Sequence, residues 1–242
     1  MTDVALVTGS SRGIGAATAA LLARKGFAVC INYLEQREKA EALVAQLRAE
    51  QCTAMCVQAD VSDRTQVDAM VRKIEEQLGH VSLLVNNAGI ARYRQFQDVE
   101  PETLQRVFAV NYGGCFHSSQ AVIGPMLHAH EGCIINISSI WGLHGASCES
   151  VYSSTKHAII GLTRSLAAEF ALSGIRVNCV APGVIDTDMI QALGEETLEQ
   201  LRGEMPFRRF GTPEEVAESV WHLASSKYIT GQVLTVDGGF LF

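Results

Sequence analysis

Short runs rich in Val, Ile and Leu alternate with amphipathic stretches along the chain, and this alternation constrains the fold more than any other feature. Strands that are apolar throughout are buried on both faces, and an intervening helix makes consecutive strands parallel. We therefore predict an α/β fold built on a doubly wound parallel sheet of about seven strands. The predicted strands are 4–8, 27–33, 53–58, 81–87, 133–138, 175–182 and 232–237.

The alternation has one interruption, the charged segment 186–212, which contains three glycines and a proline. A long insertion beside the carboxyl edge of a parallel sheet is a candidate substrate lid, and a solvated helical excursion is the alternative. The chain has 242 residues and no internal repeat or linker-like stretch. We expect a single domain over 1–242, because one α/β domain commonly reaches this size.

The sequence TGSSRGIG, residues 8–15, follows the first strand and opens the first helix. Gly9 permits a tight turn, Gly13 lets the backbone approach a pyrophosphate, and Gly15 lets the helix pack closely on the strand. The free N–H groups of the first helical turn would then bind the anion. This context predicts a Rossmann-like dinucleotide site that includes Gly9, Ser11, Arg12, Gly13, Ile14 and Gly15.

The end of the second strand indicates which nicotinamide cofactor is bound. It reads Asn32-Tyr33, where an acidic residue would accept hydrogen bonds from a free ribose 2′-hydroxyl. Arg12, joined by Arg37, could instead neutralise a 2′-phosphate. We therefore favour NADP(H) over NAD(H), although Glu35 lies near the distance expected for an acidic partner.

Other turns at the same sheet edge complete the predicted cofactor site, because ligands of open α/β sheets bind outside the carboxyl ends of the strands. Asp60 and Val61 would meet the adenine, and Thr187 would hold the nicotinamide carboxamide. Small residues after the fourth strand let the backbone come close to the cofactor. The residues assigned here are Asn32, Asp60, Val61, Asn87, Ala88, Gly89, Ile185 and Thr187.

Tyr152 and Lys156 stand four residues apart in a helical pattern, so both project from one face. Reduction of a carbonyl by hydride requires a proton donor for the oxygen, and a nearby ammonium favours ionisation of a phenol. Ser139, just after the fifth strand, can donate a hydrogen bond to the same oxygen. We predict that Ser139, Tyr152 and Lys156 are catalytic, with Tyr152 as general acid, and that Tyr152 and Lys156 also contact the cofactor.

The combination of TGSSRGIG, NNAG, Ser139, YSSTK and PGVIDTDM resembles the short-chain dehydrogenase/reductase superfamily, and within it the 3-oxoacyl-carrier-protein reductase group. The similarity covers residues 3–242. It implies NADPH-dependent reduction of a ketone, and a catalytic Asn111 that kinks a helix and relays protons through water to Lys156. It also implies a homotetramer, with the helix carrying Tyr152 and the C-terminal segment 236–242 at the interfaces.

The substrate has more than one interpretation. Carrier-protein reductases dock their acidic carrier through basic residues, but the corresponding segments here, 127–132 and 171–175, read LHAHEG and ALSGI. The segment 138–149 is similar to that of bacterial reductases of the 5-aminopentanone carried on elongation factor P. Glu149 could then pair with a substrate ammonium, or it could be a solvated acid at a helix N-terminus. A non-catalytic NADP(H)-binding sensor is a less favoured third function.

Composition argues against other classes of protein. The net charge of −7, with scattered Lys and Arg, argues against nucleic acid as a partner. No apolar stretch is long enough to span a membrane, and no targeting leader is evident, so we expect a cytoplasmic protein. The seven cysteines are odd in number and mostly in apolar segments. This pattern favours reduced thiols, and we expect no metal site.

Overall fold

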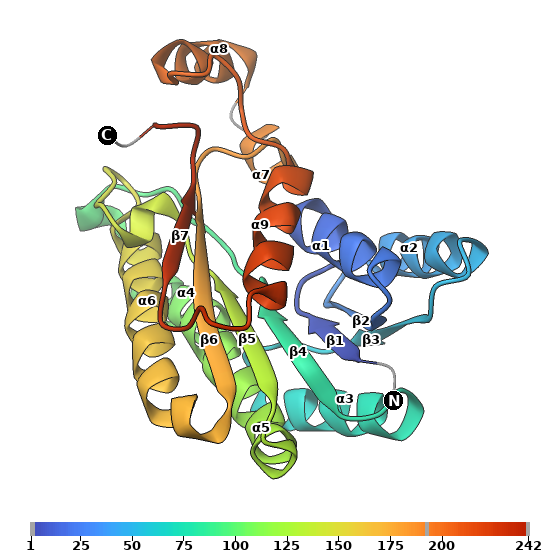
Figure 1. The fold of residues 1–242 in the computed structure, drawn as a ribbon. Helices are drawn as coiled ribbons and strands as arrows, with labels where there is room; N and C mark the ends of the chain where they lie inside the picture. The colour runs from blue at the N-terminus through green and yellow to red at the C-terminus, as the bar shows by residue number, and fades with distance from the viewer. Residues whose placement is uncertain (1–2, 192–193, 241–242) are drawn as a thin grey trace.

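The computed structural model describes residues 3–191 and 194–240. Within these residues, seven parallel strands form one sheet in the order β3-β2-β1-β4-β5-β6-β7 (Figure 1). The predicted doubly wound α/β fold is therefore confirmed, and the strand ends differ from the predicted ends by at most one residue. The strands are β1 (Val4–Val7), β2 (Ala28–Tyr33), β3 (Ala54–Gln58), β4 (Val81–Asn86), β5 (Gly132–Ile137), β6 (Ile175–Pro182) and β7 (Val233–Val236).

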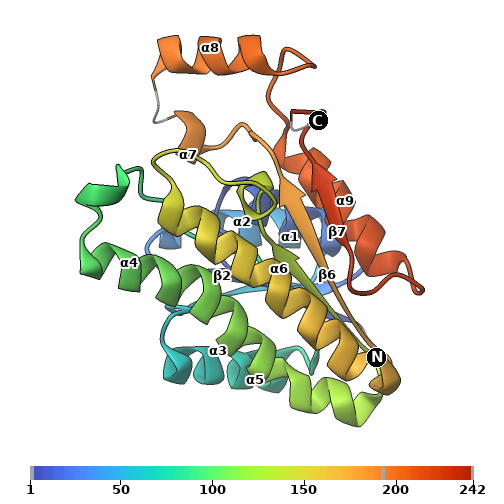
Figure 2. The same cartoon turned by 90° about the vertical axis from the view of Figure 1, so that its left-hand side faces the viewer.

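Helices cover both faces of the sheet, as Figures 1 and 2 show. One face carries α1 (Gly13–Arg24), α2 (Arg37–Ala49) and α9 (Pro213–Ser225). The other carries α3 (Arg64–Gln77), α4 (Pro101–Phe108), α5 (Gly114–Ala129) and α6 (Ser150–Phe170).

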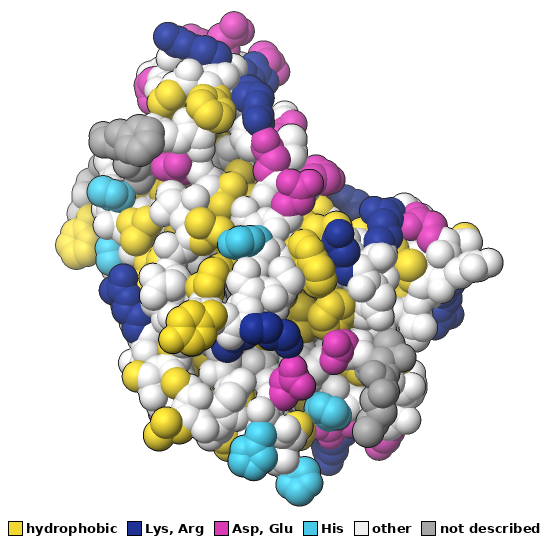
Figure 3. Space-filling model, in the orientation of Figure 1, with side chains coloured by type: hydrophobic (Ala, Val, Ile, Leu, Met, Phe, Trp, Pro, Cys, Tyr) yellow, Lys and Arg dark blue, Asp and Glu magenta, His cyan; other side chains and the backbone are white. Residues whose placement is uncertain are grey.

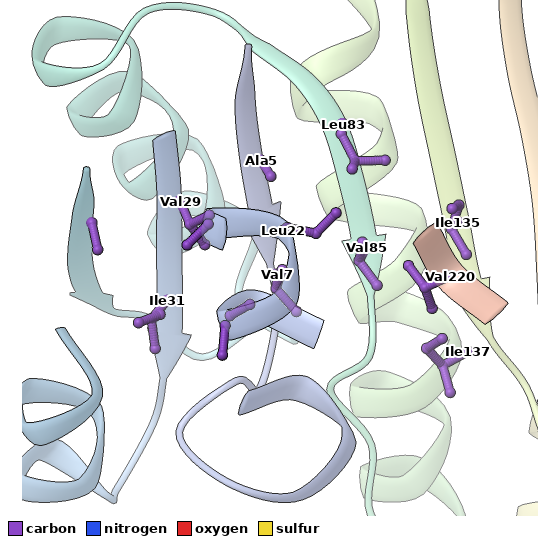
Figure 4. Close-up of a cluster of buried hydrophobic side chains, with 14 of the residues drawn as sticks. Ala5, Val7, Leu22, Val29, Ile31, Leu83, Val85, Ile135, Ile137 and Val220 are labelled. Atoms are coloured by element: carbon purple, nitrogen blue, oxygen red, sulfur yellow. The ribbon is translucent and has the colours of Figure 1, made fainter. Parts of the chain in front are cut away.

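Successive residues of one strand serve opposite layers because side chains alternate across a strand. In β1, Ala5 and Val7 join Leu22 of α1 and Val220 of α9 in one core (Figure 4). Leu6, the residue between them, belongs to the core on the other face. This arrangement explains why the central strands are apolar at every position.

Local signals explain where several helices begin. The Asp63 carboxylate accepts hydrogen bonds from the N–H groups of Thr65 and Gln66 and so caps α3. Thr212 and Glu215 form a reciprocal capping box at α9, with a proline at the first helical position. Between α4 and α5, a π-helical turn, Ala109–Gly113, joins the two helices.

The segment 186–212 begins and ends at the same place beside the sheet. Its two ends are joined by a parallel bridge between Ile185 and Gly211, where Asp186 N donates to Gly211 O at 2.8 Å. Between these ends, α7 (Asp188–Gln191) and α8 (Glu195–Glu204) stand beyond the carboxyl edge of the sheet (Figure 2). Residues 192–193 lie outside the described part. The lid remains a prediction, and this placement is compatible with it.

Three expectations drawn from composition concern surface charge, membrane spans and cysteines, and each can be compared with the described residues. On the face seen in Figure 3, Lys and Arg side chains are interspersed with Asp and Glu. Among the described residues, no helix is both long and apolar enough to cross a membrane. The seven cysteines are free thiols, and burial raises the pKa of Cys115 to about 12 and of Cys133 and Cys179 to about 11.

Candidate active site

The glycine turn after β1 packs directly against the turn after β4, at the point where the strand order reverses. Gly9 has φ +60°, and a Cβ there would lie 2.8 Å from the Cα of Ala88. A Cβ on Gly15 would lie 2.5 Å from Asn87 Nδ2 and 2.6 Å from Gly9 O. The Asn87 amide also donates to the carbonyls of Thr8 and Gly9. The glycine turn therefore requires residues without side chains at positions 9 and 15.

The start of α1 fits the pyrophosphate of a dinucleotide. The N-cap residue, Arg12, makes no capping hydrogen bond through its side chain within the described residues, and the first backbone bond runs from Ala16 N to Arg12 O at 3.2 Å. The N–H groups of Gly13, Ile14 and Gly15 therefore precede the helical ladder and face the turn. Gly13, at φ +55°, leaves room for close approach, although a Cβ there would come within 3.4 Å of Thr187 Cγ2.

The Asn32 side chain is engaged within the protein. Its side chain is buried, with Oδ1 accepting from Gly9 N at 3.0 Å and Nδ2 donating to Ala59 O at 3.1 Å. Asn32 therefore braces the glycine turn, and its contact with a cofactor remains a prediction. Arg37 is also engaged, because its Nε donates to Tyr33 Oη at 3.2 Å.

Asp60 follows β3, near the expected adenine position, and its carboxylate already has partners. It accepts from Ser62 and forms an ion pair with Arg106 at 2.9 Å. Burial alone would raise the pKa of Asp60, but the hydrogen bonds from Ser62 and Arg106 outweigh burial and hold it below the ordinary value. The neighbouring Val61 is buried, and its carbonyl lies 3.2 Å from His117 Nδ1.

The three predicted reacting residues come from two elements that pack together. Ser139 follows β5, and its Oγ accepts from Trp141 N at 3.1 Å, which leaves its O–H free to donate. Tyr152 and Lys156 stand on α6, with the Lys156 ammonium 5.4 Å from the centre of the Tyr152 ring. Lys156 is buried and donates to Ile137 O at 2.9 Å. Within the described residues, the Tyr152 phenol has no hydrogen-bond partner.

Asn111 lies in the π-helical turn and joins three parts of the site. Its Nδ2 donates to Thr155 Oγ1 and to Ile90 O, both at 3.0 Å, and its Oδ1 accepts from Ile90 N at 2.8 Å. A Cβ on Gly89 would lie 3.4 Å from Asn111 Oδ1 and 3.5 Å from Lys156 Nζ. The structure therefore brings Asn111, Gly89 and Lys156 together, and π-helical turns are frequent at functional sites.

Two residues of the site were not among the sequence predictions. Thr155 holds Asn111, and its position three residues after Tyr152 on one helical face is the signal that could have identified it. Lys39 of α2 lies 3.3 Å from the Asp188 carboxylate, which also pairs with Arg12 at 2.9 Å. No local pattern identifies Lys39, since its position relative to Arg12 depends on how distant segments pack.

Comparison with known proteins agrees with this geometry. A family model described as "Enoyl-(Acyl carrier protein) reductase" matches residues 9–241. The 3-oxoacyl-(acyl-carrier-protein) reductase FabG of Staphylococcus aureus is 43% identical over 99% of this chain and 98% of its own. A reductase of the same description from Synechocystis is 42% identical over 99% and 97%, and nodulation protein G of Azospirillum brasilense is 40% identical over 98% and 97%.

These matches extend over nearly the whole chain, so they include the glycine turn, the π-helical turn and the helix that carries Tyr152. A family model that spans most of the chain and full-length relatives above 40% identity show the family as well as the fold. The chain therefore belongs to the short-chain dehydrogenase/reductase family of nicotinamide-dependent oxidoreductases.

Proposed function

We propose that this protein uses NADPH to reduce the ketone of a 3-oxoacyl thioester to a secondary alcohol. The observation that carries the proposal is the buried Lys156 ammonium, held by Ile137 O beside the Tyr152 ring. The relatives described as 3-oxoacyl-(acyl-carrier-protein) reductases support the substrate class. The family model carries the name of an enoyl reductase. We nevertheless favour a ketone substrate, because a proton donor beside a hydroxyl donor suits a substrate oxygen that accepts negative charge.

Each group of the site has a role in this proposal. The free O–H of Ser139 and the phenol of Tyr152 hold the ketone oxygen, and Tyr152 transfers its proton as negative charge develops there. Lys156 stabilises the phenolate that remains, because an ammonium in a buried site interacts strongly with a nearby anion. Asn111 fixes the segment that follows β4 beside Lys156. NADPH would supply the hydride.

Preference for NADP(H) is supported by the charge beside the glycine turn. Arg12 and Lys39 converge there, and β2 ends without an acidic residue. A 2′-phosphate would form charge-assisted hydrogen bonds with these cations. A direct comparison of NADPH and NADH tests this half of the proposal.

The rim of the site carries cationic side chains that suit an acidic carrier. Arg94 N donates to Cys148 O at 2.9 Å, and Ile90 is held by Asn111, so this segment is fixed to the site at both ends. Arg92 and Arg94 are exposed, and within the described residues neither forms an ion pair. We propose that they contribute to docking of an acyl carrier protein.

The two segments that lack basic residues lie far from this rim. They meet at the start of two neighbouring strands, where Gly132 pairs with Ile175, at the edge of the sheet opposite Tyr152. Charge there would not steer a carrier toward the site of the same chain. A homotetramer is part of the proposal, and light scattering on the purified protein measures it.

Glu149 favours a second candidate, reduction of the aminoketone carried on elongation factor P. Its side chain is partly buried at the start of α6, and burial raises its pKa. Among the described residues it forms no hydrogen bond or ion pair through its carboxyl. It immediately precedes α6, three residues before Tyr152, and could pair with a substrate ammonium.

One assay separates these functions. The purified protein is given NADPH or NADH with an acetoacetyl thioester and, separately, with aminopentanone-modified elongation factor P. We expect turnover of the thioester with NADPH, and loss of that turnover in Tyr152→Phe. Turnover of only the modified factor would replace the first proposal by the second. Tight NADPH binding without turnover of any ketone would favour a non-catalytic sensor.

A further inference from the structure

The Asp188 carboxylate joins two cationic side chains that come from different elements. Its Oδ2 accepts from Arg12 Nη1 at 2.9 Å and from Lys39 Nζ at 3.3 Å. Arg12 immediately precedes α1, Lys39 lies in α2, and Asp188 opens α7 within the segment 186–212. One oxygen atom therefore receives hydrogen bonds from two cations, which shows that these cations can converge on a single anion.

The same two cations border the place where a dinucleotide ribose is distinguished. In doubly wound folds that place lies beside the glycine turn and the end of the second strand, which here is Tyr33. Arg37 is the other basic residue nearby, but it is directed to Tyr33 Oη at 3.2 Å and to Glu41 at 3.8 Å. Arg12 and Lys39 are therefore the pair that is placed to receive a 2′-phosphate.

We propose that Asp188 is an internal competitor for the two cations that bind the 2′-phosphate of NADP(H), and that Lys39 acts with Arg12 as a determinant of cofactor specificity. This inference rests on the proposed use of NADP(H). Arrival of the 2′-phosphate would release Asp188, and with it the start of α7, from Arg12 and Lys39. A cofactor without that phosphate would leave the bridge in place.

A 2′-phosphate should bind Arg12 and Lys39 more strongly than the Asp188 carboxylate does, so it can replace Asp188. All three side chains are about half exposed, at 54% for Arg12, 49% for Lys39 and 57% for Asp188. Ion pairs this exposed are weak, because water screens the two charges. A phosphate monoester carries up to two negative charges and three acceptor oxygens, so it competes well with one carboxylate for the same donors.

The position of Thr187 links the Asp188 bridge to the candidate lid, the segment 186–212. Thr187, which directly precedes Asp188, lies so close to the glycine turn that a Cβ on Gly13 would come within 3.4 Å of its methyl group. The bridge therefore holds the base of the 186–212 segment against the turn that would bind the pyrophosphate. Its release would couple occupation of the 2′-phosphate site to movement of this segment.

The test compares three variants by calorimetric titration with NADPH, NADH, adenosine 2′-monophosphate and adenosine 5′-monophosphate. Asp188→Asn removes the competing charge, and Lys39→Ala removes one cation. Asp186→Asn is the matched control, because Asp186 is an exposed acid in the same segment whose carboxylate contacts Gln191 and, in the described part of the chain, no cation. All three positions are exposed, so the variants are expected to fold, and circular dichroism verifies this.

We expect Asp188→Asn to bind NADPH and adenosine 2′-monophosphate about two- to fivefold more tightly, the range that follows from an exposed ion pair. NADH and adenosine 5′-monophosphate should bind unchanged, and Asp186→Asn should match the wild type. Lys39→Ala should weaken binding of the two 2′-phosphorylated ligands about three- to tenfold. These differences should shrink as salt rises from about 0.05 to 0.5 M.

Two other results would overturn the inference. One is that Asp188→Asn binds NADPH no more tightly than the wild type. The other is that its affinity increases equally for NADPH and NADH. Failure of the proposed cofactor looks different: adenosine 2′-monophosphate would then bind no better than the 5′-isomer to any variant, while NADH would be the cofactor consumed.

Discussion

Lys156 lies in an environment that is costly for an ammonium group. Its side chain is 4% exposed, and its one hydrogen bond to the described residues goes to a neutral carbonyl, that of Ile137. A buried charge is costly unless an opposite charge or several hydrogen bonds compensate it. In the proposed mechanism, negative charge that develops on the nearby Tyr152 oxygen would compensate this buried ammonium.

Replacement of Tyr152 tests this role directly. Tyr152→Phe removes the phenolic proton and leaves the ring, so we expect kcat for ketone reduction to fall by about 10²- to 10⁴-fold. NADPH affinity should change far less than kcat, because the aromatic ring and Lys156 remain in place. Steady-state kinetics and NADPH fluorescence measure the two quantities. Tyr228→Phe, at a fully exposed tyrosine, is the control. A Tyr152→Phe enzyme that keeps more than a tenth of the wild-type kcat would contradict the role of Tyr152 as proton donor.

Glu149 provides a test by pH. Because burial raises its pKa in the folded state above the ordinary 4.5, the protonated carboxyl stabilises the fold at low pH. That stabilisation is lost as pH rises through the raised pKa, whereas Glu149→Gln is neutral throughout. We therefore expect the free energy of unfolding of Glu149→Gln to increase relative to the wild type between about pH 4.5 and 7.

Urea unfolding of both proteins across this pH range measures the difference. Glu169→Gln, at an exposed acid on the same helix, should show no such trend. A Glu149→Gln protein that becomes relatively less stable as pH rises would mean that the carboxylate has a stabilising partner.

At the scale of elements, the position of α6 depends on the short helical turn that precedes it. Gly142 ends this turn, Ile140–Gly142, and a Cβ there would lie 2.8 Å from Lys156 O and closer still to Ser138 Oγ. Ser138 Oγ also donates to Lys156 O at 2.8 Å. The distance between Ser139 and Lys156 is thus set by a contact that only glycine permits.

A pair of glycine substitutions tests this contact. Gly142→Ala should destabilise the protein by about 1–3 kcal/mol, because the new methyl group has no room, and should lower kcat by moving α6 relative to Ser139. Gly124→Ala in α5 is the matched control, since no heavy atom lies within 4 Å of its Cβ position. It should stabilise by about 0.5–1 kcal/mol through helix propensity and leave kcat unchanged. Equal effects of the two substitutions would contradict this account.

At the scale of the whole molecule, one sheet separates two cores, and both must be intact for its edge to hold the site. Leu84 in β4 is fully buried in the core beneath α3 and α5, whereas Leu172 is fully exposed. Leu84→Ala should lower the free energy of unfolding by about 2–5 kcal/mol. Leu172→Ala should change it by less than about 0.5 kcal/mol. Urea titration followed by circular dichroism measures both, and similar losses would contradict the assigned core.

Much of the fold and part of the site could be predicted from local pattern. Periods of two and 3.6 residues locate strands and helices, and three glycines after a strand indicate a dinucleotide turn. The pairing of Tyr152 with Lys156 follows from helical spacing alone. The role of Asn32 could not be predicted, because its buried amide is used by Gly9 and Ala59, whose positions depend on how β2 packs between β1 and β3.

The sequence by itself therefore determined the α/β class, the parallel sheet and the spacing of the proposed reacting residues, since these follow from positions along one strand or one helix. Only the tertiary structure decided which distant residues meet. It placed Asn111 beside Lys156 through a π-helical turn, and it joined Arg12, Lys39 and Asp188 across the carboxyl edge of the sheet. The physical reason is that such contacts depend on the packing of helices over the strand crossovers, which no local pattern encodes.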